Sequence, residues 1–544
     1  MSKLDKYFEN WMSIFRTYYN LPLLIKVFFF VAIVFGTVIR LQNLFHYGYY
    51  FDTVYTQYNW GKVGFEIGIF EFWKSYDGFF DYSFLSLILE TVLYSISRLF
   101  TETATGFVVA LKSFNWFVEI CLVGYVFRLV RKYSPEKNLR VKYSISFFLG
   151  GLIYCLPSLW FVSAVWGQND TLISLLGAIS LELIFLKPAN ENNNLAKEKK
   201  FGNIISIFRD RFFWSGLVFA FGFWIKQQII MILPVLMIYH LKGKTWWDIL
   251  NIILWSSPVF LCFALGLRYF EVSDFAATRN IGLVGLVFIS VSLFAFVGKL
   301  DRWVYARRQG FGFLIVSLSI LIPCLALNYI RTGSTMFAVV GRLNISSNGA
   351  ANLWRLLGVD GDASQPLLNV NGQELLTISS VGILIYTVVM LVLYLNYQHI
   401  SWRRLFSNDI KNLQSLVTRA LTFKDAITIT TISSGAYFMF FTKMHSRYLH
   451  FFIVFSILSL AFLKFSKLFM WWLVIVLFVH FAYFLNQLGV YYDQNNPYPG
   501  WIIEIIESFN SEYWSYWKFS SLISLLGILK LHSLAIKILK ILPK

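Results

Sequence analysis

The sequence predicts an all-α integral membrane protein with roughly 14 transmembrane helices. Of its 544 residues, 57% are hydrophobic, 19% are aromatic and only 14% are charged, and the mean hydropathy is +0.60. So little charge cannot cover the surface of a soluble globular protein that is this rich in apolar side chains. The apolar residues also recur in runs of about 20, the length of helix that crosses a bilayer.

The positions of the basic residues predict the orientation of the chain. The formal net charge of +18 would suit a nucleic-acid-binding surface, but the Lys and Arg residues occur in short loops between apolar runs. That distribution is typical of the cytoplasmic side of a membrane protein. The first apolar run, 23–40, follows a basic stretch without a small-residue cleavage site. We therefore expect a cytoplasmic N-terminus and no removable signal peptide.

The segment after the first span decides the topology. FLSLILETVLYSISRLF (84–100) is apolar enough to be counted as a span, but Glu90 and Arg98 interrupt it, as in a helix that lies on the membrane surface. The interfacial interpretation places all later basic loops and the C-terminus in the cytoplasm, whereas a span here would place them outside. We predict one polytopic domain, 1–544. It comprises a core module, 1–240, with an outer loop 42–106, and variable C-terminal helices, 241–544, with an outer loop 331–375.

With this topology, polar side chains gather at the outer ends of the helices. A charge at the centre of a membrane helix costs about 2.5–3.5 kcal/mol, so such groups usually pair with each other or with a ligand. Each one alone has a plain structural explanation, as a helix cap or an interfacial anchor. Their convergence on one face indicates a site. The segments are YYFDTVYTQYNW, DYSF, SAVWGQND, FWIKQQ, NGAANLWRLLG and KMHSRY, and they supply Asp52, Asp81, Gln168, Asp170, Lys226, Gln227, Asn352, Arg355, His445 and Arg447.

This combination of charges favours a particular chemistry. A carboxylate can accept the proton of an attacking hydroxyl group. Lys, Arg and His side chains can hold a phosphate whose negative charge grows as it leaves. A sugar linked to a lipid phosphate would suit a site at this depth, because its tail stays in the bilayer while its head reaches the outer face.

These motifs resemble those of the multi-spanning GT-C glycosyltransferases. SAVWGQNDT, FWIKQQIIMILPVLMIY, NGAANLWRLLG and KMHSRYLHFF follow the order of the bacterial mannosyltransferase-like group, whose patterns read roughly WGQxD, KPQ, NxWxLLG and MHERY. The chain is similar, more distantly, to the endoplasmic-reticulum glucosyltransferases that extend lipid-linked oligosaccharides. It departs from the family in three places: DYPP reads DYSF, KPQ reads KQQ and MHERY reads MHSRY.

The resemblance implies a GT-C fold and inverting transfer of one hexose from a polyprenyl-phosphate donor to an acceptor glycan or glycolipid at the extracytoplasmic face. It implies that Asp52 is the general base. The matching positions then imply a substrate-binding set and a phosphate-binding set. The first contains Asp81, Tyr82, Trp166, Gln168, Asp170, Asn352 and Trp354, and the second contains Lys226, Gln227, His445 and Arg447.

Two other classes of function stay open. One is a polymerase or ligase that moves a lipid-linked oligosaccharide, and the other is a non-enzymatic flippase or transporter, for which charges at mid-membrane and internal repeats would be typical. We expect no cofactor, since no DxD pair indicates a divalent metal, and no nucleic-acid partner. The Asn-, Lys-, Ile- and Phe-rich composition favours a bacterial plasma membrane, with the endoplasmic reticulum as the alternative.

Overall fold

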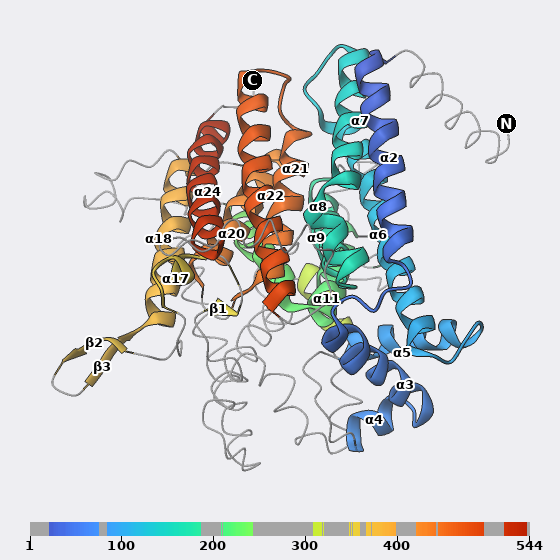
Figure 1. Cartoon of the computed structure of the whole chain (residues 1–544). Helices are drawn as coiled ribbons and strands as arrows, with labels where there is room; N and C mark the ends of the chain where they lie inside the picture. The colour runs from blue at the N-terminus through green and yellow to red at the C-terminus, as the bar shows by residue number, and fades with distance from the viewer. Residues whose placement is uncertain are drawn as a thin grey trace.

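The computed structural model describes most of the predicted core module and part of the C-terminal half. The described residues are 21–75, 84–186, 208, 210–242, 308–317, 319, 347–348, 350, 352–359, 366–370, 373–398, 420–441, 444–493 and 516–540. Helices dominate these ranges, and the strands among them are short. They pack side by side into a bundle, with shorter elements gathered beyond one end of it (Figure 1).

The chain enters the bundle through one long helix and then forms a short-helix segment. Its elements are α2 (Leu23–Asn43), the π-helix η1 (Phe51–Tyr58), α3 (Asn59–Glu66), α4 (Ile69–Ser75) and α5 (Phe84–Arg98). With 15 residues, α5 is too short to cross a bilayer. It buries Leu87 and Tyr94 against the protein and exposes Val92 and Ile96. This two-sided helix fits the predicted interfacial segment.

The chain then returns through the bundle and bends between α7 and α8, next to α2. Its next elements are α6 (Ala104–Tyr133), α7 (Leu139–Cys155), α8 (Pro157–Trp160), the π-helix η2 (Phe161–Val165) and α9 (Asp170–Phe185). Pro157 stands at the first helical position of α8, where it has no N–H to donate to the preceding turn. The direction changes there by 47° between α7 and the α8–η2 segment.

The remaining described elements complete the bundle, and α11, α20 and α21 among them pack against α9. The first group is α11 (Arg211–Ile225), the 3₁₀ helix η3 (Gln227–Ile232), α12 (Leu233–Leu241), β1 (Ser347–Asn348), α17 (Leu353–Leu356), β2 (Pro366–Val370), β3 (Gln373–Thr377) and α18 (Ile378–Gln398). The second group is α20 (Phe423–Phe440), β4 (Met444–His445), the 3₁₀ helix η6 (Ser446–Tyr448), α21 (Leu449–Leu460), α22 (Lys467–Asp493) and α24 (Tyr516–Lys540). β1 pairs in parallel with β4, and β2 pairs antiparallel with β3.

The structure supports a helical membrane protein, but the described part does not reach the predicted count of spans. Five of its helices are long and apolar enough to cross a membrane, and a sixth is obtained if the bent pair of α7 with α8–η2 counts as one span. Three further apolar stretches, Arg211–Ile225, Gln227–Leu241 and Ser446–Leu460, are shorter than this. Fourteen spans of the GT-C type are therefore not shown, and much of 243–307 and 399–419 lies outside the described residues.

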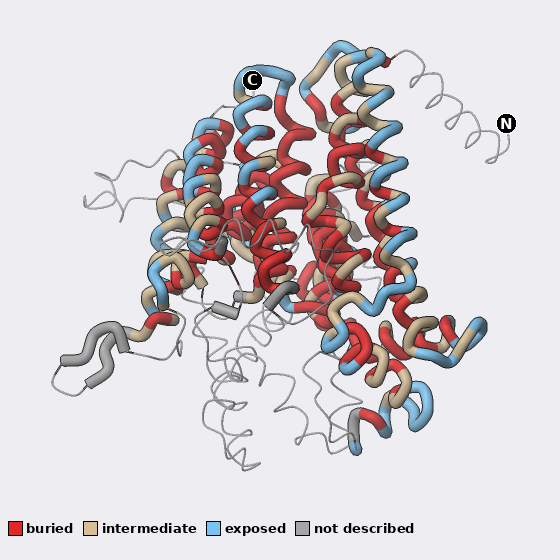
Figure 2. The backbone as a smooth tube through the Cα atoms, in the orientation of Figure 1, coloured by how far each residue is buried: buried red, intermediate tan, exposed pale blue. Residues whose placement is uncertain are grey.

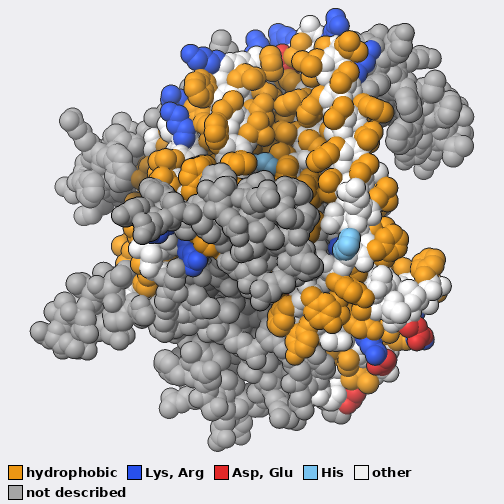
Figure 3. All heavy atoms as spheres, in the orientation of Figure 1, with side chains coloured by type: hydrophobic (Ala, Val, Ile, Leu, Met, Phe, Trp, Pro, Cys, Tyr) orange, Lys and Arg blue, Asp and Glu red, His pale blue; other side chains and the backbone are white. Residues whose placement is uncertain are grey.

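Burial follows the pattern of a bundle in lipid. Buried residues fill the centre, and exposed residues lie along the outward side of α2 (Figure 2). That side carries Leu23 and Leu24, which are 75% and 78% exposed, and Phe30. Apolar side chains cover the same surface in the space-filling view, and Lys and Arg gather along its upper rim (Figure 3). An apolar flank below a basic rim is what a bilayer with cytoplasmic headgroups would cover.

Loops that meet at one end of the bundle account for part of this basic rim. α6 ends with Arg131 and Lys132, and Lys464 and Lys467 are exposed between α21 and α22. The two connections touch, because the N–H of Phe465 donates to Oε1 of Glu136 at 2.6 Å. Two of the predicted basic loops therefore lie at the same end, as the positive-inside interpretation requires.

Candidate functional site

The side chain of Asp52 is the meeting point of three distant segments. Its Oδ2 accepts hydrogen bonds from Nε1 of Trp166 and Nε2 of Gln168, each at 3.0 Å, and from Nη1 of Arg447 at 2.6 Å. Asp52 lies in η1 and Arg447 in η6. All three donors converge on one carboxylate oxygen, while 18% of the Asp52 side chain remains exposed. The carboxylate is therefore only partly covered by the protein.

The backbone between η2 and α9 explains how Trp166 and Gln168 reach the same oxygen. The N–H of Trp166 donates to the carbonyl of Phe161 at 2.7 Å, and that of Gln168 to the carbonyl of Val162 at 2.8 Å. Gly167 between them has φ of +79°, a conformation that glycine adopts without strain. A Cβ atom at Gly167 would also lie 2.8 Å from Thr53 Cγ2. Glycine is thus required for this turn to pack against η1.

A second ion pair lies beside the first and is connected to it through Gln168. Nζ of Lys226 lies 2.5 Å from Oδ1 of Asp170 and donates to Oε1 of Gln168 at 3.3 Å. Gln168 therefore donates to Asp52 with its amide nitrogen and accepts from Lys226 with its amide oxygen, which settles the orientation of the amide. Lys226 and Asp170 are only 5% exposed. The four charged groups form one network of two cations and two carboxylates, in which Asp52 is the most exposed member.

Burial shapes the protonation of the groups around this network. It lowers the pKa of Lys226, in the turn between α11 and η3, to about 8, although the neighbouring Asp170 carboxylate opposes the shift. Burial, followed by the Asp52 charge, raises the pKa of Tyr49 to about 12. In α5, burial raises the pKa of Glu90 to about 8, with Lys226 acting in the opposite direction. Tyr49 and Glu90 are thus neutral at pH 7, and Lys226 is mostly charged.

His445 lies next to Arg447 but does not contribute a positive charge. Its ring packs against Trp166, with 5.5 Å between centroids. Burial, then repulsion from Arg447 and Lys226, holds its pKa well below the ordinary value of 6.5. Its Nδ1 accepts the N–H of Arg447 at 3.5 Å, which leaves the ring proton on Nε2. As a phosphate ligand, His445 could act only as a neutral hydrogen-bond donor.

The other predicted site residues occupy different surroundings. Asn352 caps α17 by accepting the N–H of Arg355, and Nε1 of Trp354 donates to the carbonyl of Phe440 at 2.8 Å. Both side chains are buried and engaged with the protein. Gln227, the first residue of η3, is exposed. Asp81 and Tyr82 lie outside the described residues.

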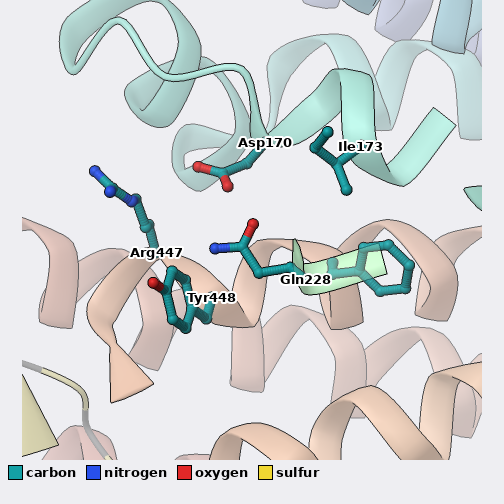
Figure 4. Close-up of a pocket in the computed structure, with 6 residues that line it drawn as sticks. Asp170, Ile173, Gln228, Arg447 and Tyr448 are labelled. Carbon is teal, nitrogen blue, oxygen red and sulfur yellow. The ribbon is translucent and has the colours of Figure 1, made fainter. Parts of the chain in front are cut away.

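The structure brings in residues that sequence reasoning missed. Gln228 and Tyr448 line a small cavity next to Asp170 and Arg447, together with Ile173 and Phe451 (Figure 4). Gln228 was adjacent to a predicted position, and the repeated Gln in FWIKQQ was the available signal. Only the turn of η3 shows which of the two glutamines faces inward. In the sequence, Glu90 was interpreted only as a polar residue of the interfacial helix, and nothing there indicated that it interacts with Lys226 of the site.

Comparisons with known proteins do not name a family. No family model matches the chain, and no curated protein matches it. Within the described ranges, no group of three or more His, Cys, Asp or Glu side chains is arranged to hold a metal ion. The site therefore has to be interpreted from its own geometry.

Proposed function

We propose that the protein is a membrane glycosyltransferase that moves one hexose from a polyprenyl-phosphate donor to a hydroxyl group of an acceptor glycan or glycolipid. The observation that carries this proposal is the convergence on Asp52. A carboxylate with one side open lies within 2.6 Å of an arginine, at the end of a helix bundle with an apolar flank. A base next to a phosphate-binding cation is what sugar transfer from a phosphate requires.

The reaction needs one displacement at the anomeric carbon. The acceptor oxygen forms the new bond to C1 and passes its proton to Asp52. The bond from C1 to the phosphate oxygen breaks, and polyprenyl phosphate leaves with the electron pair. Attack opposite to the leaving group inverts the configuration, as in enzymes that use a carboxylate as a base rather than as a nucleophile. No metal or redox group is needed for this balance.

Arg447 is suited to link the two reacting ends. A guanidinium carries five N–H donors in one plane, and its Nη1 is the donor to Asp52. The plane can therefore contact the carboxylate and a phosphate oxygen simultaneously, a geometry that an ammonium group cannot reproduce. The carbonyl of Arg447 accepts the hydroxyl of Tyr483 at 2.9 Å, which fixes the backbone of η6. Lys226 would add a second cation on the Gln168 side.

The arrangement of the helices supports an extracytoplasmic site. α9 begins next to the site at Asp170, and α21 begins just after Arg447. α21 leads to the basic connection at Lys464, and α6 also ends in basic residues. The site and these basic loops thus lie at opposite ends of the helices, and the preference of basic loops for the cytoplasm favours an extracytoplasmic site. The GT-C fold, roughly 14 spans and a bacterial plasma membrane belong to the same proposal.

A buried ion pair favours the transporter alternative to a limited extent. Nε of Arg40 lies 2.7 Å from Oε2 of Glu119, and both residues are 2% exposed inside helices of spanning length. Charges within spans often mark transport pathways. Here Arg40 also donates to the carbonyls of Gly36 and Tyr154, and Glu119 accepts the hydroxyl of Ser163. These contacts attach the pair to α2, α7 and, through Ser163, to η2, so a positioning role explains it better.

The deciding experiment measures chemistry directly. Purified protein in nanodiscs is incubated with synthetic short-chain polyprenyl-phosphate hexoses and a mixture of glycan and glycolipid acceptors, and released polyprenyl phosphate is detected by mass spectrometry. Acceptor-dependent release that disappears in Asp52→Asn supports a glycosyltransferase. If every hexose donor is recovered intact, the proposal is wrong. Passage of the intact lipid-linked donor across a proteoliposome bilayer would instead support a flippase.

A further inference from the structure

A small cavity next to the two ion pairs has a polar side and an apolar side. Asp170, Gln228, Arg447 and Tyr448 line it, and Ile173 and Phe451 complete its wall. Its volume of about 10 Å³ is close to the smallest space that holds one water molecule. The cavity is therefore too small for a sugar ring but large enough for one oxygen-bearing group.

One atom of this lining points to a ligand. Oδ1 of Asp170 is occupied by Lys226 at 2.5 Å, whereas Oδ2 is buried without a hydrogen-bond partner among the described residues. Buried polar atoms in native proteins are almost always satisfied by protein or water. A carboxylate only accepts hydrogen bonds, so the missing partner has to be a donor. Because Asp170 also lines the cavity, the cavity is the space next to this carboxylate in which such a donor can lie.

Gln228 supplies the complementary group. The side chains of Asp170 and Gln228 lie on opposite sides of the cavity, and Arg447 and Tyr448 lie together at one end of it (Figure 4). A hydroxyl group placed between them can donate to Asp170 Oδ2 and accept from the Gln228 amide. Ile173 and Phe451 offer an apolar surface to the carbon that bears it. A substrate in which hydrogen replaces this hydroxyl group would not bind well, because it lacks the donor. A substrate with a methoxy group in its place would be too large for the cavity.

We propose that this cavity is a subsite for a single hydroxyl group, occupied by one water in the free protein and by one hydroxyl of the transferred hexose in the complex. This inference rests on the proposed glycosyltransferase function and deepens it. Gln228 becomes a specificity-determining residue, and Asp170 has a second role beside its pairing with Lys226. The subsite selects hexoses with a free hydroxyl at one ring position and rejects donors that are deoxygenated or O-methylated there.

The test compares donors that differ by one oxygen. A series of short-chain polyprenyl-phosphate hexoses, each with one hydroxyl replaced by hydrogen, is assayed for kcat/KM with the wild type, Gln228→Leu and the matched control Gln42→Leu, at an exposed glutamine of α2. Sites built to bond a substrate hydroxyl reject analogues that lack it by up to about 10⁴–10⁵-fold. We expect the wild type to lose at least about 100-fold at one position, and Gln228→Leu to reduce that ratio to about tenfold or less. Gln42→Leu should behave as the wild type.

Three outcomes separate the possibilities. Equal tolerance of all deoxy donors by an active wild type overturns the subsite and leaves the proposed function intact. A positional penalty that persists in folded Gln228→Leu assigns the selectivity elsewhere and also overturns it. No transfer from any hexose overturns the proposed function and this inference together.

A structure of the free protein, detailed enough to show waters, should place one at Asp170 Oδ2, and a dry cavity would contradict the proposal. Gln228→Met, which keeps the side-chain length, replaces Gln228→Leu if the latter fails to fold.

Discussion

Arg447 donates to Asp52 at 2.6 Å across 395 residues of sequence, and this contact joins the proposed base to the proposed phosphate ligand. It holds both groups in register before any substrate binds. It also neutralises them, as Lys226 and Asp170 neutralise each other at 2.5 Å. The free site therefore carries no net charge from these four residues. An incoming phosphate anion has to share Arg447 with Asp52 instead of finding an unpaired cation.

Asp52→Asn should abolish transfer while the donor still binds. The amide keeps the shape of the side chain but cannot accept a proton, and a general base typically contributes about 10²–10⁴-fold. The measurement is kcat with the preferred donor and acceptor, together with donor binding at equilibrium. Glu66→Gln, at an exposed residue of α3 that pairs with Lys62, is the control and should keep full activity. A loss of less than tenfold would move the role of base to another carboxylate.

Arg447→Lys should lower kcat/KM at least tenfold although the charge is preserved. Lysine is a point charge and cannot contact Asp52 and a phosphate together through one plane. Each 1.4 kcal/mol of lost transition-state stabilisation gives a factor of about ten. The control is Arg98→Lys, which changes an arginine that pairs with Glu102 at the exposed end of α5. Wild-type rates for both Arg447→Lys and Lys226→Gln would show that these cations are only structural.

The Arg40–Glu119 pair should matter more when it is broken than when it is replaced. Leaving one buried charge without its partner costs about 3–5 kcal/mol, whereas exchange of both for apolar residues is often neutral. Arg40→Met should therefore lower the Tm of the detergent-solubilised protein more than the double variant Arg40→Met/Glu119→Met. The control is Arg128→Met. Arg128 pairs with Glu182, but its side chain is 55% exposed, so this change should have little effect on the Tm. If the double variant is the least stable of the three, the pair is a net stabiliser.

The double variant Arg40→Met/Glu119→Met also tests whether the ion pair helps to position η2 and the residues that hold Asp52. Glu119 accepts the hydroxyl of Ser163 at 2.5 Å, and Ser163 lies in η2, three residues before Trp166. Loss of that anchor should lower kcat with little change in KM, because Trp166 and Gln168 would hold Asp52 less well. Ser163→Ala should reproduce the kcat effect, and Ser163→Thr should restore it. Unchanged kcat in folded Ser163→Ala would separate the pair from the site.

Glu90 predicts a dependence of stability on pH. Burial raises its pKa from 4.5 to about 8, so the folded state binds more protons than the unfolded state between these values. The free energy of unfolding then falls as the pH rises from about 4.5 through 8. Glu90→Gln removes this contribution and should raise the Tm relative to the wild type at pH 8.5 but hardly at pH 4.5. Glu102→Gln, at an exposed carboxylate, is the control. Parallel pH profiles for the wild type and Glu90→Gln would contradict the assignment.

Cysteine labelling tests the orientation. In a variant without native cysteines, Cys at Glu102 should react with an impermeant maleimide from outside intact cells, and Cys at Lys137 should react only after lysis. Both positions are exposed, so accessibility depends on the side of the membrane. Asn169 and Ser446 are buried and would label poorly on either side. Labelling of position 137 from outside would reverse the topology and move the site to the cytoplasm.

The sequence alone determined that this protein has helices suited to a lipid bilayer, and it identified several residues of the candidate site. Apolar runs with little charge indicate helices in a bilayer, because that environment penalises every unpaired backbone and charged group. Asp52, Gln168, Asp170, Lys226 and Arg447 were predicted from polar segments between those runs, and Trp166 was predicted from the family resemblance. The structure brings these six together. A local pattern is enough for such residues, since polar groups at helix ends stand out against hydrocarbon.

Only the tertiary structure decided how these residues are paired and which neighbours they have. Whether a cation is paired with a carboxylate or open to a ligand depends on side chains hundreds of residues apart, as for Asp52 and Arg447. The same holds for Gln227 and Gln228, which are adjacent in sequence but lie on different sides of one 3₁₀ turn. Asn352 and Trp354 matched a motif, yet their partners are backbone groups of the protein. Sequence specifies which groups avoid lipid, whereas packing in three dimensions specifies which partner each of them finds.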